Sequence, residues 1–152
     1  MALKEKLQND LTEAMRARDE VRSSTIRMVL TAIKNEEVSG KEARDLSDAE
    51  VITVLSREAK KRREAAEAFE LAGAKDRADN EKAEGLVIAG YLPEQLSEAE
   101  LKEMIASVIK ETGATGPQQM GLVMKSIQPK IASRADGGTV SSLVKAALSG
   151  GN

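Results

Sequence analysis

Apolar residues recur every three or four positions through almost the whole chain, and polar residues fill the positions between them. This spacing places the apolar side chains on one face of an α-helix, whereas a half-buried strand would alternate with a period of two. No such alternation and no Asn-Gly hairpin turn interrupts the pattern, so the chain is predicted to be all-α. The predicted helices cover about residues 2–18, 21–38, 48–72, 75–90, 98–113, 118–131 and 139–148.

Serine caps, glycines and one proline mark the ends of these helices. The segments Ser47–Glu50 and Ser97–Glu100 have the capping-box spacing, in which the serine hydroxyl and the glutamate carboxylate each accept a backbone N–H of the first turn. Gly40 and Gly73 follow the second and third helices, where left-handed glycines often terminate a helix. Pro129 is expected to bend or split the sixth helix.

The sequence Tyr91-Leu92-Pro93 breaks the helical pattern, because proline lacks an N–H and disfavours helical geometry in the residue before it. We place a domain boundary here. It separates an N-terminal bundle of about four helices, residues 1–92, from a small three-helix C-terminal part, residues 93–152. The second part is near the lower size limit for independent folding. Its predicted core consists of Leu101, Ile105, Val123, Ile127, Leu143 and Val144.

The residue types that the chain lacks exclude most catalytic chemistry. It contains no histidine, cysteine or tryptophan, which removes the commonest general base, the commonest transition-metal ligands and the Ser-His and Cys-His nucleophile pairs. Phe69 and Tyr91 are its only aromatic residues, so recognition of several stacked bases is excluded. Phosphate-binding, dinucleotide-binding and nucleophile-elbow glycine motifs are also absent. We expect no catalytic residue, cofactor or metal.

The same features suggest a compartment. No apolar run is long enough to span a membrane, and the first residues are charged and amphipathic rather than typical of a secretory signal. Without cysteine the chain cannot form disulfides. We therefore expect a cytoplasmic protein with no membrane contact.

Charge is distributed unevenly in the last third of the chain. Residues 93–111 contain two lysines and five glutamates, a net charge of −3, whereas residues 112–152 contain four basic residues and one aspartate, a net charge of +3. An overall charge of −2 therefore conceals a basic end. Its basic residues are Lys125, Lys130, Arg134 and Lys145.

Two interpretations of this basic end remain open. The pair Gly137-Gly138 opens the last helix, where unpaired N–H groups and the positive end of the helix dipole favour an anion, and the nearby cations suit a nucleic-acid phosphate. In the other interpretation the segment is an ordinary turn, in which Gly137 has a positive φ and Thr139 caps the helix. Composition does not separate the two.

The run from Arg57 to Arg63 is a second basic cluster, with five cations and one acid, Glu58. It could contact phosphate. We favour a solvated helix face, because three acids follow within two turns and can pair with it: Glu64, Glu67 and Glu70.

Two further groups have a structural and a functional interpretation. Met120 and Met124 have core spacing but could line a partner groove. Gly121 between them costs a helix about 1 kcal/mol relative to alanine, which indicates close approach of another helix or of a ligand backbone. Glu81 and Glu84 could serve acid–base chemistry or a metal, but surface ion pairing is the favoured interpretation on such a charged helix.

Four segments covering nearly the full length carry a family resemblance. They are Ser23–Glu37, the helix around Lys60–Glu64, Tyr91–Leu101 with the sequence YLPEQLSEAEL, and MGLVMK at Met120–Lys125 continuing through RADG at Arg134–Gly137 to Leu148. In these segments the chain resembles the YqeY-like proteins, the stand-alone members of the GatB/YqeY family.

The resemblance implies an all-helical, two-part fold and kinship with the C-terminal region of the B subunit of the glutamine-dependent tRNA amidotransferase. That enzyme converts Glu-tRNA(Gln) or Asp-tRNA(Asn) to the amide, and the helical tail of its B subunit contacts tRNA. Stand-alone members are assigned carbon–nitrogen ligase activity with glutamine as amido-N-donor, but this chain lacks the kinase-like half and the amidase. The resemblance thus implies a tRNA-binding module without catalysis of its own, acting beside amidotransferase subunits or an aminoacyl-tRNA synthetase.

The positions that the resemblance transfers to tRNA binding are Lys125, Lys130, Arg134, Gly137, Gly138 and Lys145. Two positions depart from the family pattern: Ser133 replaces a usual glycine, and Gly138 replaces a lysine or another polar residue. The alternative to tRNA binding is a protein–protein interaction module in which the MGLVMK helix is the docking surface. An amide-transferring enzyme is the third hypothesis, and the missing residue types disfavour it.

Overall fold

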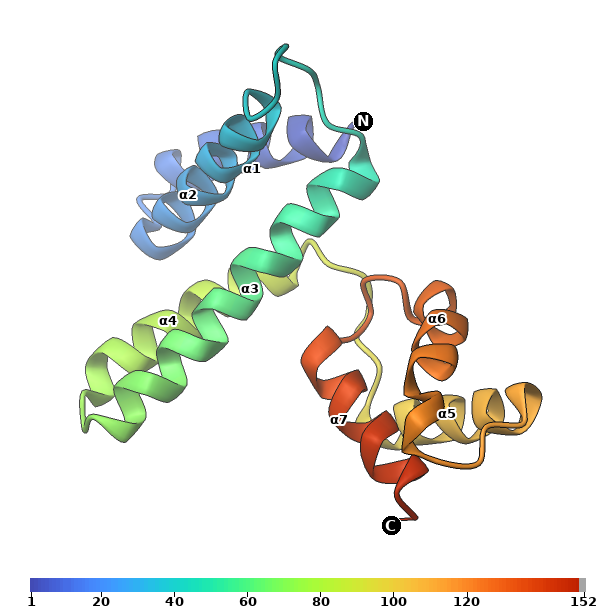
Figure 1. Cartoon of the computed structure of the whole chain (residues 1–152). Helices are drawn as coiled ribbons and strands as arrows, with labels where there is room; N and C mark the ends of the chain where they lie inside the picture. Colours follow the sequence, from blue (N-terminus) through green and yellow to red (C-terminus); the bar gives the residue numbers. More distant parts are fainter. Residues whose placement is uncertain (151–152) are drawn as a thin grey trace. The chain divides into compact units, whose positions relative to one another are not determined.

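A computed structural model describes residues 1–150, and over that range the chain is helical without any strand (Figure 1). The all-α prediction is confirmed. The helices are α1 (Leu3–Arg16), α2 (Glu20–Glu37), α3 (Asp48–Leu71), α4 (Lys75–Ala89), α5 (Glu98–Thr112), the 3-10 turn η1 (Pro117–Gln119), α6 (Met120–Ile131) and α7 (Gly137–Leu148). No helix within residues 1–150 has the length and apolar character needed to cross a membrane.

The chain forms two compact units, of which the first spans Met1–Leu92 and the second begins at Pro93. In the first unit α3 and α4 form a long antiparallel hairpin, and α1 pairs with α2 (Figure 1). One aliphatic core joins them: Leu7, Ile26, Val29, Ile33, Val51, Val54, Leu55 and Ile88.

In the second unit α5, α6 and α7 all contact one another around a separate core. Five of the six predicted core residues are buried there, and Leu143 is half-buried against them. The core also contains Val108, Ala114, Ile131, Val140 and Leu148.

The predicted helix ends are largely confirmed. In the capping box that starts α3, the Glu50 N–H donates to Ser47 Oγ at 3.2 Å and the Ser47 N–H donates to Glu50 Oε2 at 2.8 Å. Ser97 and Glu100 start α5 in the same way. Gly73 follows α3 with a φ of +75°.

The expectation for Gly40 is wrong. Gly40 does not terminate α2 in the left-handed region, because the helix already ends at Glu37 and is capped by Val38 with a φ of −107°. Of the two effects expected of Pro129, splitting does not occur, since α6 continues through it to Ile131. A proline this close to the end of a helix removes only one backbone hydrogen bond.

Tyr91, near the end of the first unit, belongs to a polar cluster with residues of α1 and α2. Its hydroxyl donates to the carboxylate of Asp10 on α1, and Lys6 Nζ lies 4.9 Å from the centre of its ring. Arg22 Nη2 lies 3.6 Å from Asp10 Oδ2. Burial, followed by the hydrogen bond to Asp10, raises the pKa of Tyr91 to about 12, whereas the hydrogen bond from Tyr91 lowers the pKa of Asp10.

These shifts predict that folding holds Tyr91 protonated at alkaline pH. Because the folded pKa lies above the unfolded value of about 10, the stabilisation is complete below that value and is lost as the pH rises through about 12. Tyr91 is the only tyrosine and there is no tryptophan, so phenolate absorbance reports this residue alone. We expect its midpoint near 12 in the folded chain and near 10 in urea.

The variant Asp10→Asn serves as the control, since it removes the negative charge that disfavours the phenolate. Its folded-state midpoint should shift toward the ordinary tyrosine value. A midpoint near 10 in the folded parent chain would contradict the buried Tyr91–Asp10 contact.

Candidate nucleic-acid interface

The predicted tRNA-binding residues all lie in the second unit, but they have different structural roles. Lys125 on α6 and Lys145 in the last turn of α7 are exposed. Neither makes a hydrogen bond or an ion pair to any residue in the part of the chain that the structure describes. Their ammonium groups are therefore available to an external anion.

Lys130 is already paired. Its Nζ lies 3.0 Å from Glu111 Oε2 near the end of α5, and both side chains are well exposed. Exposed ion pairs of this kind contribute about 0–1 kcal/mol, because water screens them. A phosphate can therefore compete with Glu111 for Lys130 at little cost.

Arg134 lies in the turn between α6 and α7, where it forms hydrogen bonds to the segment that precedes α5. Its Nε donates to the Glu94 carbonyl at 3.1 Å, and its own carbonyl accepts the Leu96 N–H at 2.8 Å. Gln95 Nε2 donates to the Ser133 carbonyl at 3.1 Å. These three hydrogen bonds join residues about forty positions apart in the chain, so Arg134 has a structural role that the sequence did not reveal.

The start of α7 is occupied by an acid. Asp136 is the N-cap residue, and its Oδ2 accepts the Thr139 N–H at 3.1 Å and the Thr139 hydroxyl at 3.2 Å. This carboxylate lies where an anion would bind and its charge offsets the positive end of the helix dipole. The exposed Gly137 and Gly138 therefore form a poorer phosphate site than the sequence suggests.

Two details of the ordinary-turn interpretation are wrong. Asp136 caps the helix rather than Thr139, and Gly137 does not have a positive φ. The strained residue is instead Ala132, with φ and ψ of +50° and −125°, at the end of α6. The Arg134 N–H donates to the Ile131 carbonyl at 3.0 Å across it, which is the pattern of a type II′ turn with alanine at the position that favours glycine.

The methionines of α6 belong to the core rather than to a partner groove. Met120 and Met124 are half-buried and pack against the aliphatic cluster of the second unit. A side chain added at Gly121 would meet no other atom within 4 Å, so this glycine is not required by helix packing within the chain. Leu122 beside it is 46% exposed. The outer face of α6 is therefore open.

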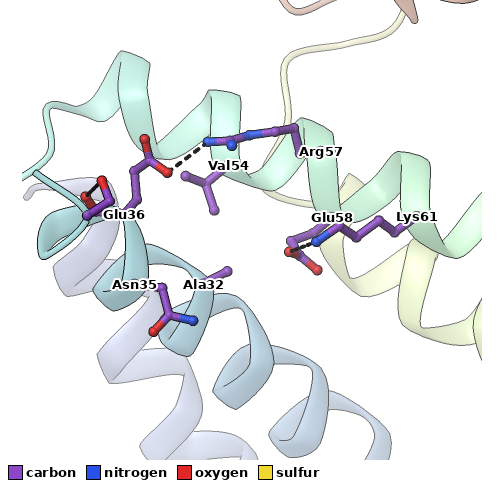
Figure 2. A pocket seen from close by; sticks show the side chains of 8 residues that line it. Ala32, Asn35, Glu36, Val54, Arg57, Glu58 and Lys61 are labelled. Carbon is purple, nitrogen blue, oxygen red and sulfur yellow. Dashed lines mark hydrogen bonds and ion pairs between the residues drawn. The ribbon is translucent and has the colours of Figure 1, made fainter.

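The basic run of α3 is only partly a solvated face. Arg57 and Lys61 are exposed cations, as expected, but they pair with Glu36 and Glu58, at 3.4 and 3.3 Å (Figure 2), rather than with the acids that follow the run. Arg62, however, is only 7% exposed. Neither interpretation of the sequence included a buried arginine in this run.

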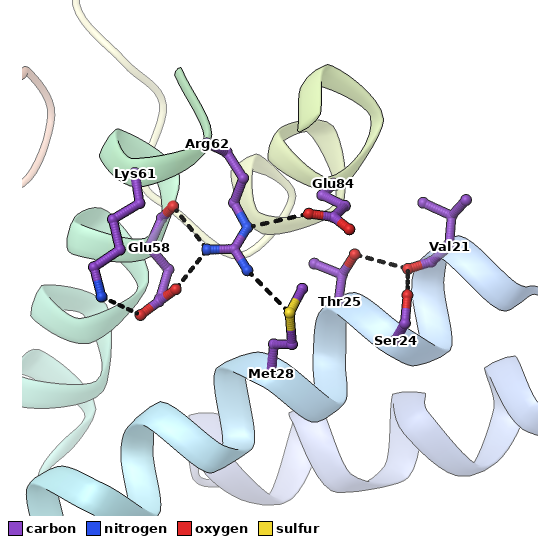
Figure 3. Close-up of polar contacts among 8 residues, drawn as sticks. All are labelled: Val21, Ser24, Thr25, Met28, Glu58, Lys61, Arg62 and Glu84. Atoms are coloured by element: carbon purple, nitrogen blue, oxygen red, sulfur yellow. Dashed lines mark hydrogen bonds and ion pairs between the residues drawn. The ribbon is translucent and has the colours of Figure 1, made fainter. Parts of the chain in front are cut away.

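Arg62 joins three helices of the first unit (Figure 3). Its Nη1 donates to the Glu58 carbonyl at 3.2 Å and to the Glu58 carboxylate, and its Nη2 contacts Met28 Sδ on α2 at 3.5 Å. Its Nε lies 3.5 Å from Glu84 Oε2 on α4, close enough for an ion pair but without hydrogen-bond geometry. Burial raises the pKa of Glu84. The only signal in the sequence is the i, i+4 spacing of Glu58 and Arg62.

The surface ion pairing favoured for Glu81 and Glu84 is not what the structure shows. Glu84 pairs with the buried Arg62, and Glu81 makes no ion pair within residues 1–150. The surface pair of this helix is Lys82 with Glu70 of α3. In residues 1–150 no group of three or more acidic side chains is arranged to hold a metal ion.

Comparison with known proteins identifies the family. A model of the Yqey-like protein family matches residues 4–148, almost the whole chain. The chain belongs to this family. This confirms the resemblance inferred from its four sequence segments.

Two yeast relatives share the name "Altered inheritance of mitochondria protein 41, mitochondrial". The protein from Lachancea thermotolerans is 29% identical over 145 residues, which cover 93% of this chain and 76% of the relative. The protein from Clavispora lusitaniae is 32% identical over 136 residues, which cover 87% of this chain and 78% of the relative.

These names correct the predicted compartment. The prediction of a cytoplasmic location is wrong, because both relatives are named as mitochondrial proteins. The argument from composition failed for a physical reason: without cysteine and without a long apolar run, composition does not distinguish one aqueous compartment from another.

Replacing Ala132 with glycine should stabilise the second unit. Alanine in the positive-φ position of a type II′ turn costs about 1–3 kcal/mol, and the greater chain entropy of glycine offsets part of the gain from replacing it. We expect Ala132→Gly to raise the free energy of unfolding by about 1 kcal/mol, measured by urea denaturation with NMR signals from α5 to α7.

Gly113 provides the opposite control, since its φ is +69° and a side chain there would meet no atom within 4 Å. Gly113→Ala should therefore destabilise the unit by about 1 kcal/mol through backbone strain alone. A destabilising Ala132→Gly change would show that the turn has another geometry.

The role of Arg134 can be separated from its charge. Arg134→Lys keeps the charge but loses the Nε that donates to the Glu94 carbonyl, so we expect the second unit to lose about 1 kcal/mol of stability in the same assay. Lys125→Gln removes a charge that has no internal partner and should change stability by less than about 0.5 kcal/mol. Equal effects of the two changes would refute the structural role of Arg134.

Proposed function

We propose that this protein is a tRNA-binding helical module that positions tRNA without catalysing a reaction on its own. The observation that carries the proposal is the availability of Lys125 and Lys145 on α6 and α7, exposed and without an anionic partner in the described chain. Phosphate contacts by such lysines supply most of the affinity of sequence-independent nucleic-acid binding.

The distribution of charge in the second unit supports this proposal. The acids are concentrated at the start of α5, where Glu98 and Glu100 lie in the first helical turn and Glu100 completes the capping box. The later helices α6 and α7 contain three lysines and no acid. A polyanion would therefore meet α6 and α7 rather than the start of α5.

Recognition would depend on the shape and backbone of the RNA. The two aromatic residues lie in the first unit, where Phe69 is covered by Arg77 at 5.8 Å and Tyr91 is bonded to Asp10. The second unit has no aromatic side chain on which a base could stack. Phosphate and 2′-hydroxyl contacts remain as the available means of recognition.

The proposed role is that of the amidotransferase tail to which the family resemblance points. In that role the module would hold tRNA for amidotransferase subunits or for an aminoacyl-tRNA synthetase, and the glutamine-dependent carbon–nitrogen ligase chemistry would belong to those partners. The absence of histidine and cysteine supports a module without its own nucleophile pair.

The test is a titration of the full chain with tRNA at two salt concentrations. The double variant Lys125→Gln/Lys145→Gln should weaken binding and reduce the slope of log affinity against log salt by about two, since each lysine neutralises roughly one phosphate. Because neither lysine has an internal partner, the variant should fold normally.

The matched control is Lys102→Gln/Lys110→Gln on α5, which makes the same change in net charge at exposed positions. It should bind tRNA nearly as well as the parent chain. Equal losses in both double variants would indicate binding by net charge alone and would contradict the proposed face. Affinity that is insensitive to salt and to both variants would favour the protein-interaction alternative, in which the outer face of α6 docks on a protein.

A further inference from the structure

One carboxylate contacts a cation of the proposed tRNA-binding face. Helices α6 and α7 contain three lysines, and of these only Lys130 forms an ion pair within residues 1–150. Its partner is Glu111, in the last turn of α5. Both carboxylate oxygens of Glu111 lie close to Lys130 Nζ, at 3.3 and 3.0 Å. This pair therefore decides whether the third lysine is available to an anion.

The position of Glu111 does not favour the stability of its own helix. The C-terminal end of a helix has a negative partial charge, so a carboxylate in the last turn of α5 is repelled by it. By contrast, Glu98 and Glu100 lie in the first turn of α5, where a carboxylate is favoured, and Glu100 completes the capping box. Within residues 1–150 Glu111 contacts no charged group of opposite sign other than Lys130. Its contact with Lys130 is thus the one favourable interaction that the structure gives its charge.

Lys130 does not need Glu111 in return. It lies in the last turn of α6, where the helix dipole favours a cation. The side chains of Lys130 and Glu111 are 44% and 58% exposed, so water screens their attraction and the pair can open without unfolding the unit. Without Glu111, Lys130 would be an exposed and unpaired cation, as Lys125 and Lys145 are.

The pair lowers what Lys130 can contribute to the binding of a polyanion. A phosphate at Lys130 must replace Glu111, and the displaced carboxylate stays nearby as a like charge. Affinity for nucleic acid comes largely from the counterions that are released when cations neutralise phosphates. A lysine that is already neutralised by a carboxylate releases fewer of them than a free lysine. The loss is small, because an exposed ion pair is weak.

We propose that Glu111 is a competing carboxylate that occupies Lys130 in the free protein and limits the affinity of the second unit for tRNA phosphates. The inference rests on the proposed tRNA-binding function and adds a control of affinity at that same face. Lys125 and Lys145 bind phosphates without competition, whereas Lys130 does so only when it leaves Glu111. Such a limit suits a module that positions tRNA for another protein, because the module must also release it.

The experiment is a titration of the full chain and its variants with tRNA over a series of salt concentrations. Glu111→Gln keeps the shape of the side chain and removes its charge. We expect this variant to bind tRNA about threefold to fivefold more tightly than the parent chain at the lowest salt concentration, the range of an exposed ion pair. The slope of log affinity against log salt should become steeper by about one, since Lys130 then neutralises roughly one further phosphate.

The matched control is Glu98→Gln. Glu98 Oε1 lies 3.2 Å from Lys102 Nζ in another exposed lysine–glutamate pair, and both of its residues belong to α5. The variant makes the same change in net charge and also frees a lysine, but away from α6 and α7. It should change the affinity for tRNA by less than about twofold, because salt screens distant charges. Amide spectra of both variants confirm that they are folded.

A double-variant cycle tests whether Glu111 acts through Lys130. In the Lys130→Gln background, the further change Glu111→Gln should give little or no gain in affinity, because the cation that it frees is absent. A full gain in that background would assign the effect to general repulsion between Glu111 and RNA and would overturn the proposal.

The remaining outcomes separate this inference from the proposed function. If the parent chain binds tRNA and Glu111→Gln binds it equally well, or no better than Glu98→Gln, the competition is refuted and the tRNA-binding function stands. Weaker binding by Glu111→Gln would show that Glu111 orients Lys130 for RNA instead of competing with it. If neither the parent chain nor Glu111→Gln binds tRNA at low salt, the proposed function fails and the inference fails with it.

Discussion

The burial of one aliphatic stripe per helix is the constraint on which each unit depends. The chain has a single phenylalanine and a single tyrosine, so leucine, isoleucine and valine must supply almost all the buried apolar area. An aliphatic stripe covers only one side of a helix. Polar side chains therefore reach the helix interfaces, and the structure must satisfy them there with ion pairs and hydrogen bonds.

Arg62 is the clearest result of this constraint. It lies where α2, α3 and α4 meet. Its guanidinium donates to Glu58 and contacts Met28, and its Nε lies in ion-pair range of Glu84 without a hydrogen bond. Removing one partner of a buried charge commonly costs about 3–5 kcal/mol, because the other charge stays buried and unpaired. The basic run of α3 therefore contributes to the packing of the first unit as well as to its surface.

The second unit satisfies its polar groups in a different way, through hydrogen bonds from a turn. Its short helices leave the segment before α5 without regular backbone partners, and the turn around Arg134 provides them. The RADG block, which the sequence pointed to as a phosphate contact, thus also holds the unit together. Among the proposed basic contacts, only Lys125 and Lys145 make no hydrogen bond or ion pair within residues 1–150, which is why the functional proposal depends on them.

The sequence by itself determined the helices, their capping boxes and most of the second core, because helix periodicity and caps depend on residues within a few positions of each other. It also determined the family, because each segment that carries the resemblance is an unbroken run of residues that can be read without the fold. Only the tertiary structure decided that Arg62 is buried, that Arg134 bonds to Glu94, and that Asp136 occupies the start of α7. The roles of Arg62 and Arg134 depend on contacts between elements distant in the chain, and that of Asp136 on a backbone geometry that composition leaves open. The pattern of residue types along the chain contains neither the distant contacts nor this backbone geometry.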